Sequence, residues 1–305
     1  MSRFYSAYNY FIESELEFDN LTPVSDASPD ISISIAKTPV IFQDCVHQGR
    51  IQIGAFKINS LNEILLDIKG LAIFCISKGR DIIVEPYPEY NKKYLQSFLL
   101  GSIMSILFHQ KGLFTLHGSA VTRDNEAIIF TGKSKAGKST FAHIFQEKGY
   151  KLLTDDVCLI ERIDSDDFIV RPAIPLLSLR ADVVENLNLR SEKLHEIGYR
   201  NEKFGYRVNH NFENVPSVIR TIIEIVECDD ELEIINYMGI EKVSSLIRNT
   251  YRIKAVNEMG LYAEHFKVFS ELAQKVNVFK VRRPTGVFVG KEIISLVENE
   301  IDSLA

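Results

Sequence analysis

The chain has 305 residues, of which 46% are hydrophobic and 25% charged, and its formal net charge is −6. This length predicts one large α/β domain with a smaller module. A nucleic-acid surface would need clustered Lys and Arg, and this sequence has no long basic run. The longest apolar stretch, residues 98–108, is too short to cross a bilayer, and the N-terminus is acidic where a secretory signal would be basic. We therefore expect a cytoplasmic protein that binds neither nucleic acid nor membrane.

The first part of the chain, residues 1–88, has the pattern of a small β-rich lobe. Short runs of β-branched and aromatic residues alternate with turn residues such as Pro23 and Gly70. The Pro86-Tyr87-Pro88 sequence then interrupts the chain, so we place the boundary there and expect a second domain over 89–305. The side chains of this lobe form no recognisable chemical constellation, which favours a scaffold or a partner surface.

A helix is expected over 91–110, followed by two strands joined by a polar turn at 123–125. If that turn has three residues, His117 in the first strand faces Thr131 in the second, to within one or two residues. Thr131 lies directly before the glycine-bounded loop that follows the second strand. His117 is therefore a candidate site residue, although a single histidine in a strand is commonly structural.

Residues 126–148 carry a Walker A motif between a predicted strand and a predicted helix. The apolar strand ends in Gly132, four residues intervene, and Gly137, Lys138 and Ser139 open the helix. The two glycines let backbone N–H groups point at one anion, at the positive end of the helix. Lys138 adds a cation for the β- and γ-phosphates, and the hydroxyl of Ser139 suits Mg²⁺, which prefers oxygen ligands.

This motif predicts binding of ATP or GTP with Mg²⁺; a glycine-rich turn without a ligand is the structural alternative. The expected binding segment comprises Gly132, Lys133, Ser134, Lys135, Ala136, Gly137, Lys138, Ser139 and Thr140.

Two adjacent carboxylates, Asp155 and Asp156, interrupt a predicted strand over 150–160. Neighbouring strand residues point to opposite faces, so we expect the two acids to have different roles. A parallel strand reached through a helical crossover ends beside the phosphate loop. One acid can then reach Mg²⁺ or its water, and the other can take a proton from an attacking hydroxyl. A surface Asp-Asp turn is the alternative.

Basic side chains gather between residues 190 and 210, where five of them lie among glutamates and two glycines. Such a segment suits a mobile lid over phosphates or a dock for a peptide, whereas a solvated surface with salt bridges is the alternative. We take Arg200 and Lys203 as the candidate substrate-binding residues.

The remaining chain is predicted to alternate strands and helices. One strand pair is expected within 169–179, and a second is formed by 219–226 with 231–236. Helices are expected over 239–251, 262–276 and 291–301. A strand is expected over 277–281, followed by a turn at Arg282-Arg283-Pro284.

Three motifs together resemble the HPr serine kinase/phosphorylase superfamily: Leu116–Ser119, the Gly132–Ser139 loop and Leu153–Asp156. The resemblance extends from about residue 91 to the C-terminus. The β-rich lobe looks like that of kinase-like members found with lasso-peptide and related peptide-tailoring systems. The resemblance implies an α/β fold with a P-loop kinase domain of the HPr kinase type and a small β-rich N-terminal lobe.

The same resemblance implies roles for individual residues. Lys138 would lie on phosphate and Ser139 on Mg²⁺, Asp155 would be the base, and Asp156 and His117 would support the metal and the acceptor. We take Asp156 with Ser139 as the expected metal residues, and all three of Asp155, Asp156 and His117 as expected catalytic residues.

The sequence departs from the family pattern at two places. Ser134-Lys135-Ala136 stands where the family commonly has Ser-Gly-x, which adds a cation near the phosphates. The family's downstream metal-binding glutamate has no convincing counterpart, with Glu224 as the one candidate, so phosphorylase activity stays open.

The sequence therefore predicts a Mg-ATP-dependent kinase that phosphorylates a serine of a peptide or small protein, with a lasso-type precursor peptide as one candidate acceptor. A nucleotide-controlled binding module that phosphorylates nothing is the alternative function. A homo-oligomer is left open.

Overall fold

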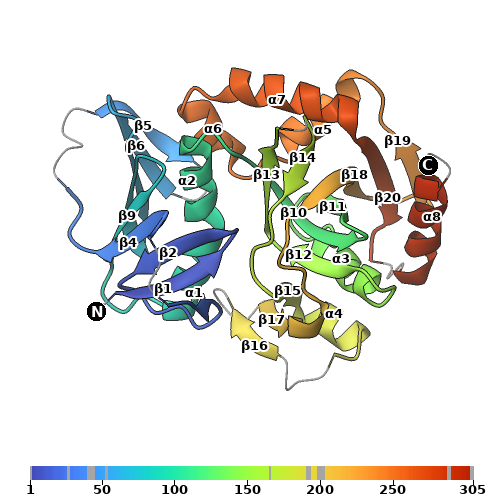
Figure 1. Ribbon diagram of the computed structural model, residues 1–305, viewed down its shortest axis with the longest axis horizontal. Helices are drawn as coiled ribbons and strands as arrows, with labels where there is room; N and C mark the ends of the chain where they lie inside the picture. Colours follow the sequence, from blue (N-terminus) through green and yellow to red (C-terminus); the bar gives the residue numbers. More distant parts are fainter. Residues whose placement is uncertain are drawn as a thin grey trace. The chain divides into compact units, whose positions relative to one another are not determined.

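The structure is a computed structural model that describes residues 2–25, 28–39, 45–51, 54–164, 166–189, 194–197, 203–286 and 290–302 (Figure 1). It is a mixed α/β structure with two compact units. Unit 1 comprises Met1–Thr115, Glu196–Lys203 and Tyr251–Ala263, and unit 2 comprises Leu116–His195, Phe204–Thr250 and Glu264–Ala305. Every helix of the described ranges is too short or too polar to span a membrane.

Unit 1 contains a nine-stranded sheet in the order β3-β1-β2-β4-β9-β8-β7-β6-β5. Side chains alternate along its strands, so that Leu66, Phe74 and Val84 are buried while Asp67 and Glu85 are less so. The strands are β1 Arg3–Ala7, β2 Tyr10–Ser14, β3 Thr22–Pro23, β4 Ile31–Ile35, β5 Cys45–Ile51, β6 Gly54–Asn59, β7 Ile64–Ile68, β8 Ala72–Ser77 and β9 Asp81–Pro86.

A continuous helical segment follows this sheet, made of α1 (Lys92–Phe98), the π-helical turn η2 (Leu99–Ile103) and α2 (Met104–Gln110). Asn91 caps it, because its side chain accepts a hydrogen bond of 2.9 Å from the Tyr94 N–H. Phe98 stacks on Phe74 of the sheet, with ring centroids 5.6 Å apart. The first segment of unit 1 extends to Thr115. The short helix α6 (Ile253–Glu258) also belongs to unit 1.

Unit 2 is built on an eight-stranded sheet in the order β11-β10-β13-β14-β18-β20-β19, with β12 paired to β10 and β11 paired to β18. Strands β11, β18 and β20 are parallel neighbours, and β10 is antiparallel to both β11 and β12. The strands are β10 Phe114–Arg123, β11 Glu126–Gly132, β12 Lys151–Thr154, β13 Val157–Arg162, β14 Phe168–Val170, β18 Ser217–Cys228, β19 Glu233–Asn236 and β20 Asn277–Pro284.

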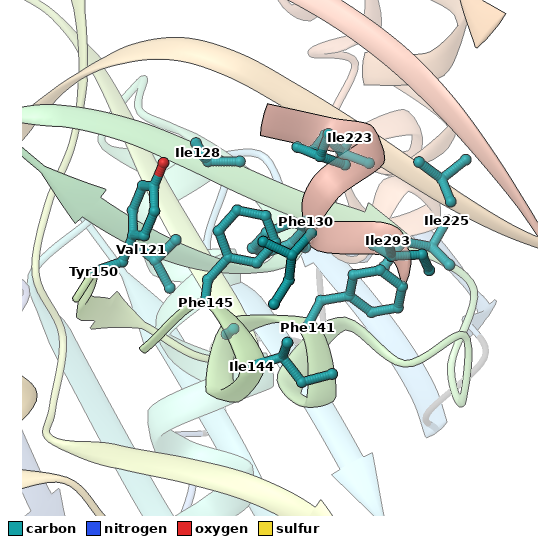
Figure 2. Close-up of a cluster of buried hydrophobic side chains, with 14 of the residues drawn as sticks. Val121, Ile128, Phe130, Phe141, Ile144, Phe145, Tyr150, Ile223, Ile225 and Ile293 are labelled. Atoms are coloured by element: carbon teal, nitrogen blue, oxygen red, sulfur yellow. The ribbon is translucent and has the colours of Figure 1, made fainter. Parts of the chain in front are cut away.

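Helices cover both faces of this sheet. Figure 1 shows α3 (Lys138–Gln146) and α8 (Gly290–Asp302) on one face, and α5 (Ile240–Arg248) and α7 (Tyr262–Lys275) on the other. On the α3 side, Phe130 of β11 lies 5.7 Å from Phe141 and 5.0 Å from Phe145, measured between ring centroids (Figure 2). The apolar face predicted for the helix after the phosphate loop is thus the face that packs on the sheet.

A three-stranded sheet has the order β15-β17-β16, with β15 Leu176–Arg180, β17 Lys203–Arg207 and β16 Leu194–Ile197. Leu177 and Leu179 of β15 are buried in the same cluster as Phe141 and Phe145. The short helix α4 (Ala181–Asn186) follows β15 in the chain, and the 3-10 turn η4 (Asn209–Asn211) follows β17. Strand β15 is therefore fixed against the helix that follows the phosphate loop.

The hairpin register differs from the expected one by one residue. Arg123 pairs with Glu126, so Gly118, rather than His117, pairs with Thr131. The turn holds only two residues, Asp124 and Asn125, with φ of 54° and 64°. These positive φ values are typical of a two-residue type I′ turn, for which Asp and Asn are suited.

Two expectations about the last strands were wrong. β18 and β19 do not pair with each other, because β20 lies between them in the sheet. Arg282, Arg283 and Pro284 are not a turn but the end of β20, paired in register with Val226, Glu227 and Cys228. The strand continues because its parallel neighbour β18 is long enough to pair with it.

Candidate active site

The loop between β11 and α3 has the backbone conformation that its glycines allow. Gly132 has φ +136°, and a Cβ at this position would lie 2.4 Å from the carbonyl oxygen of Ile225. Gly137 has φ +108° and is the N-cap residue of α3. A side chain at Gly132 would collide with β18, and one at Gly137 would be strained. The loop therefore depends on both glycines.

The N-terminus of α3 presents backbone donors. The first helical bond recorded here runs from the Phe141 N–H to the Gly137 oxygen, at 2.9 Å. The N–H groups of Lys138, Ser139 and Thr140 precede it and have no acceptor within the helix by its geometry. Glycine at the N-cap provides no side chain to satisfy them. This end of α3 is therefore suited to an anion.

Lys138 lies over the same loop. Its side chain is buried, and Nζ donates to the carbonyl oxygens of Gly132 at 3.1 Å and Lys133 at 2.9 Å. Lys133, Ser134 and Lys135 are exposed at the tip of the loop. Thus one ammonium group is held inside the loop, and two more lysines lie on its rim.

Asp155 lies against the loop's serine. Its Oδ1 accepts a hydrogen bond of 2.8 Å from Ser139 Oγ and another from Ser119 Oγ of β10, and its Oδ2 accepts one of 2.6 Å from the Ser178 N–H of β15. Asp155 directly follows β12, which runs parallel to β11 with β10 between them. The carboxyl ends of both strands thus lie at the same edge of the sheet, where ligands of α/β folds bind.

The environment raises the pKa of Asp155. Burial is the largest cause, and the charge of Asp156 also raises the pKa. Hydrogen bonds from Ser119, Ser178 and Ser139 lower it, since they favour the charged form, but they do not outweigh burial. A carboxylate with a raised pKa is a better proton acceptor than an ordinary surface aspartate.

Asp156 lies against His117. Its φ is +73°, so the chain bends at this residue rather than continuing as a strand. His117 Nδ1 lies 3.1 Å from the Asp156 carbonyl oxygen and 3.6 Å from its Oδ1. The His117 and Asp156 side chains are 24% and 36% exposed, so both are accessible from solvent.

The structure brings the predicted site residues together in two contacts. Asp155 contacts Ser139, and Asp156 contacts His117. The two acids diverge as expected, but through a backbone turn rather than through strand alternation.

Two residues of this site, Ser119 and Ser178, were not among the predicted ones, and Arg283, for which the sequence left a phosphate-facing or a surface role open, also contacts the loop. Ser119 lies two residues after His117 on the same strand, so its place beside the acids could have been read from strand alternation. Ser178 acts through its backbone N–H, for which no side-chain pattern exists. Arg283 donates from Nε to the Ala136 oxygen of the loop, at 2.8 Å.

Glu224, the candidate metal ligand, is buried on β18 in an ion pair with Arg248. Nε and Nη2 of Arg248 donate to its two oxygens at 3.0 and 2.6 Å, and Ser245 and Tyr237 donate to Oε2 at 2.8 and 3.0 Å. Burial opposes ionisation of Glu224, but the bonds from Arg248, Ser245 and Asn249 outweigh it and lower its pKa. This carboxylate is therefore engaged as the centre of a structural ion pair.

Of the two predicted substrate residues, Lys203 is exposed at the start of β17, and Arg200 lies outside the described residues. No cluster of three or more His, Cys, Asp or Glu side chains that could hold a metal occurs in the described part of the chain. Mg²⁺ with a nucleotide does not need such a cluster, because phosphates and water supply most of its ligands. The hydroxyl oxygen of Ser139 fits this mode of binding.

The chain is distantly similar to solved structures. No protein-family model matches the chain. No curated protein matches it either. Among solved structures, the HPr(Ser) kinase/phosphatase from Coxiella burnetii is similar, with 14% identity and a TM-score of 0.35 over 62% of this chain and 97% of that chain. The structural relationship to this kinase/phosphatase is therefore distant.

Proposed function

We propose that this protein is an ATP- and Mg²⁺-dependent kinase that transfers the γ-phosphoryl group to a serine hydroxyl of a peptide or small protein. The observation that carries the proposal is the hydrogen bond between Ser139 and Asp155. It joins a phosphate-binding loop to an acid with a raised pKa, at the carboxyl ends of β11 and β12.

Different groups of the chain would bind the phosphates and the Mg²⁺ of the nucleotide. The N–H groups at the start of α3 and the ammonium of Lys138 would hold the β- and γ-phosphates. The hydroxyl of Ser139 would hold Mg²⁺, which when bound neutralises charge that develops on the phosphate oxygens. The rest of the loop keeps these donors in place before the nucleotide arrives, so little ordering is needed on binding.

Transfer would form a bond between the serine oxygen and the γ-phosphorus and break the bond from that phosphorus to the β–γ bridging oxygen. The electron pair leaves with ADP, and the proton of the serine hydroxyl passes to Asp155. Burial around Asp155 favours this proton transfer because it disfavours the charged form. His117, held against Asp156, would position the acceptor at the exposed edge of the site.

The acceptor class is inferred from access and charge. His117 and Asp156 remain partly exposed, which suits an acceptor presented on a larger chain. Lys203 is an exposed cation on β17, and with Arg200 it would attract an acidic or carboxylate-ended peptide. The resemblance of the sequence motifs points to a peptide-tailoring kinase, for which a lasso-type precursor would be the acceptor.

A direct test incubates the protein with γ-labelled ATP and Mg²⁺ together with free serine, HPr, or peptides with internal or terminal serines. Any phosphate is then located by mass spectrometry. Labelling of a peptide serine that is lost in Asp155→Asn supports the proposal. The Lys138→Ala variant should lose both labelling and the thermal stabilisation given by Mg-ATP.

Two outcomes would contradict it. Labelling of free serine alone would exclude a peptide acceptor. Tight Mg-ATP binding without labelling of any acceptor would favour a nucleotide-controlled binding module.

A further inference from the structure

Glu227 and Arg283 face each other across two parallel strands next to the phosphate loop. They are register partners at the carboxyl ends of β18 and β20. Nη2 of Arg283 donates to Oε1 of Glu227, and Nη1 lies 3.5 Å from the Pro284 oxygen. The Arg283 side chain is only 14% exposed, whereas that of Glu227 is 43% exposed. The cation is thus held inside, and its counter-ion lies at the surface.

The same guanidinium holds the backbone of the loop. Nε of Arg283 donates to the Ala136 carbonyl oxygen at 2.8 Å. A peptide group is planar and trans, so its C=O and its N–H point in opposite directions. Fixing the Ala136 carbonyl on Arg283 therefore turns the N–H of Gly137 away from Arg283.

Arg283 also adds charge at the start of α3. Its Nε lies 3.7 Å from the position that a Cβ of Gly137 would occupy. A cation at this distance strengthens the attraction of the helix N-terminus for an anion. Glu227, as its ion-pair partner, weakens that attraction because it neutralises part of the charge.

From this geometry we infer that Arg283 is a positioning residue of the phosphate loop, and that Glu227 restrains it. Arg283 orients the Gly137 N–H and supplies positive charge for the nucleotide phosphates, while Glu227 keeps the affinity for them below its maximum. The inference rests on the proposed nucleotide binding, and it assigns to this pair the tuning of that binding.

The neighbouring Arg282 offers a matched control. Arg282 lies on the same strand, β20, but its side chain points to the other face. There Nη1 donates to Glu233 at 3.1 Å and Nη2 donates to Asp230. It is an arginine in ion pairs with two acids, and no contact with the loop is recorded for it among the described residues. A change at Arg282 thus removes the same charge from the same strand without touching the loop.

The test is calorimetric titration of the full chain with Mg-ATP at fixed, moderate salt. Arg283→Gln should raise the Kd about tenfold, the expected effect of a charge-assisted hydrogen bond, while Arg282→Gln stays within about twofold of the parent. Glu227→Gln should lower the Kd about threefold, because the restraint on Arg283 is removed. This gain should vanish when Arg283→Gln is also present.

The direction of the change in Kd for Glu227→Gln distinguishes the inferred restraint from a purely structural role of the ion pair. If the ion pair were only structural, breaking it would weaken binding of Mg-ATP. Weaker binding in Glu227→Gln, or an unchanged Kd in Arg283→Gln, would overturn the inference. If circular dichroism shows that Arg283→Gln is unfolded, Arg283→Lys replaces it and should bind more weakly than the parent. If the parent protein fails to bind Mg-ATP, as the Lys138→Ala variant is expected to fail, the proposed function itself is refuted.

Discussion

Ser139 and Asp155 are hydrogen-bonded at 2.8 Å, although they come from different strand-to-loop junctions of the sheet. Ser139 follows β11 through the phosphate loop, and Asp155 follows β12 directly. The bond exists because β11 and β12 run in the same direction and end at the same edge. Any chemistry at the phosphates would therefore take place beside Asp155, which makes this acid the first target for mutation.

Asp155→Asn should abolish phosphoryl transfer while the protein still binds Mg-ATP. We expect turnover to fall by on the order of a hundredfold or more, the usual contribution of a general base. Because the pKa of Asp155 is raised in the folded protein, protonation of this acid stabilises the folded state, and that stabilisation is lost as the pH rises through the folded pKa. At neutral pH the variant should therefore have an equal or higher melting temperature. A large drop in melting temperature would show that Asp155 is structural.

His117→Ala tests the exposed side of the site. His117 contacts Asp156, whereas Ser139 of the loop contacts Asp155, so nucleotide affinity should stay close to that of the parent. We expect turnover with the peptide acceptor to fall by about tenfold, since a positioning residue contributes less than the base. Titration with Mg-ATP and steady-state kinetics on one sample measure both quantities. Full activity would make this histidine a structural residue of β10.

Much of this site could be predicted because its parts are local in the sequence. The strand, the Gly132 and Gly137 bends and the α3 apolar face lie within one short segment, and each has a known physical requirement. The pairing of the acids could not be predicted. It depends on the positive φ of Asp156, which only the surrounding fold imposes.

The missed contacts are long-range or involve the backbone. Ser178 is 23 residues from Asp155 in the chain and reaches it only because β15 packs on α3. Arg283 lies 147 residues from Ala136, and the sequence placed it in a turn rather than at the end of β20. The hairpin register was off by one because the sequence does not state how many of Arg123, Asp124 and Asn125 belong to the turn.

Glu224→Gln tests the buried ion pair on β18. The lowered pKa of Glu224 means that its contribution to stability is present above its ordinary value of 4.5 and is lost as the pH falls through the lower folded pKa. Gln keeps one acceptor for Arg248 but no charge, so at pH 7 the free energy of unfolding should fall by about 1–2 kcal/mol. Urea unfolding at pH 7 and near pH 4 should show that the difference shrinks in acid. Loss of Mg²⁺-dependent nucleotide binding without loss of stability would instead make Glu224 a metal ligand.

His143→Leu tests a buried histidine on the helix that follows the phosphate loop. Among the described residues, Nδ1 of His143 has no hydrogen-bond partner, and its ring packs edge-on against Tyr206 with centroids 5.6 Å apart. Burial lowers its pKa below 6.5, with Glu147 opposing the shift only weakly. The unfolded chain therefore binds the proton first, so the parent should lose stability as the pH falls from 7 through 6.5 toward the folded pKa. Leucine cannot bind this proton.

The variant should therefore gain stability relative to the parent as the pH is lowered, and thermal unfolding at pH 7.5, 6.5 and 5.5 measures the gain. His210→Leu is the matched control, because it makes the same substitution at an exposed position, on η4. A parallel loss of stability with pH in the parent and in His143→Leu would show that other groups, and not this histidine, set the acid response. Should the gain be confirmed, protonation of His143 would loosen the contact between α3 and β17. Weaker Mg-ATP binding at pH 5.5 in the parent, restored in His143→Leu, would then connect that contact to the phosphate loop at the other end of the same helix.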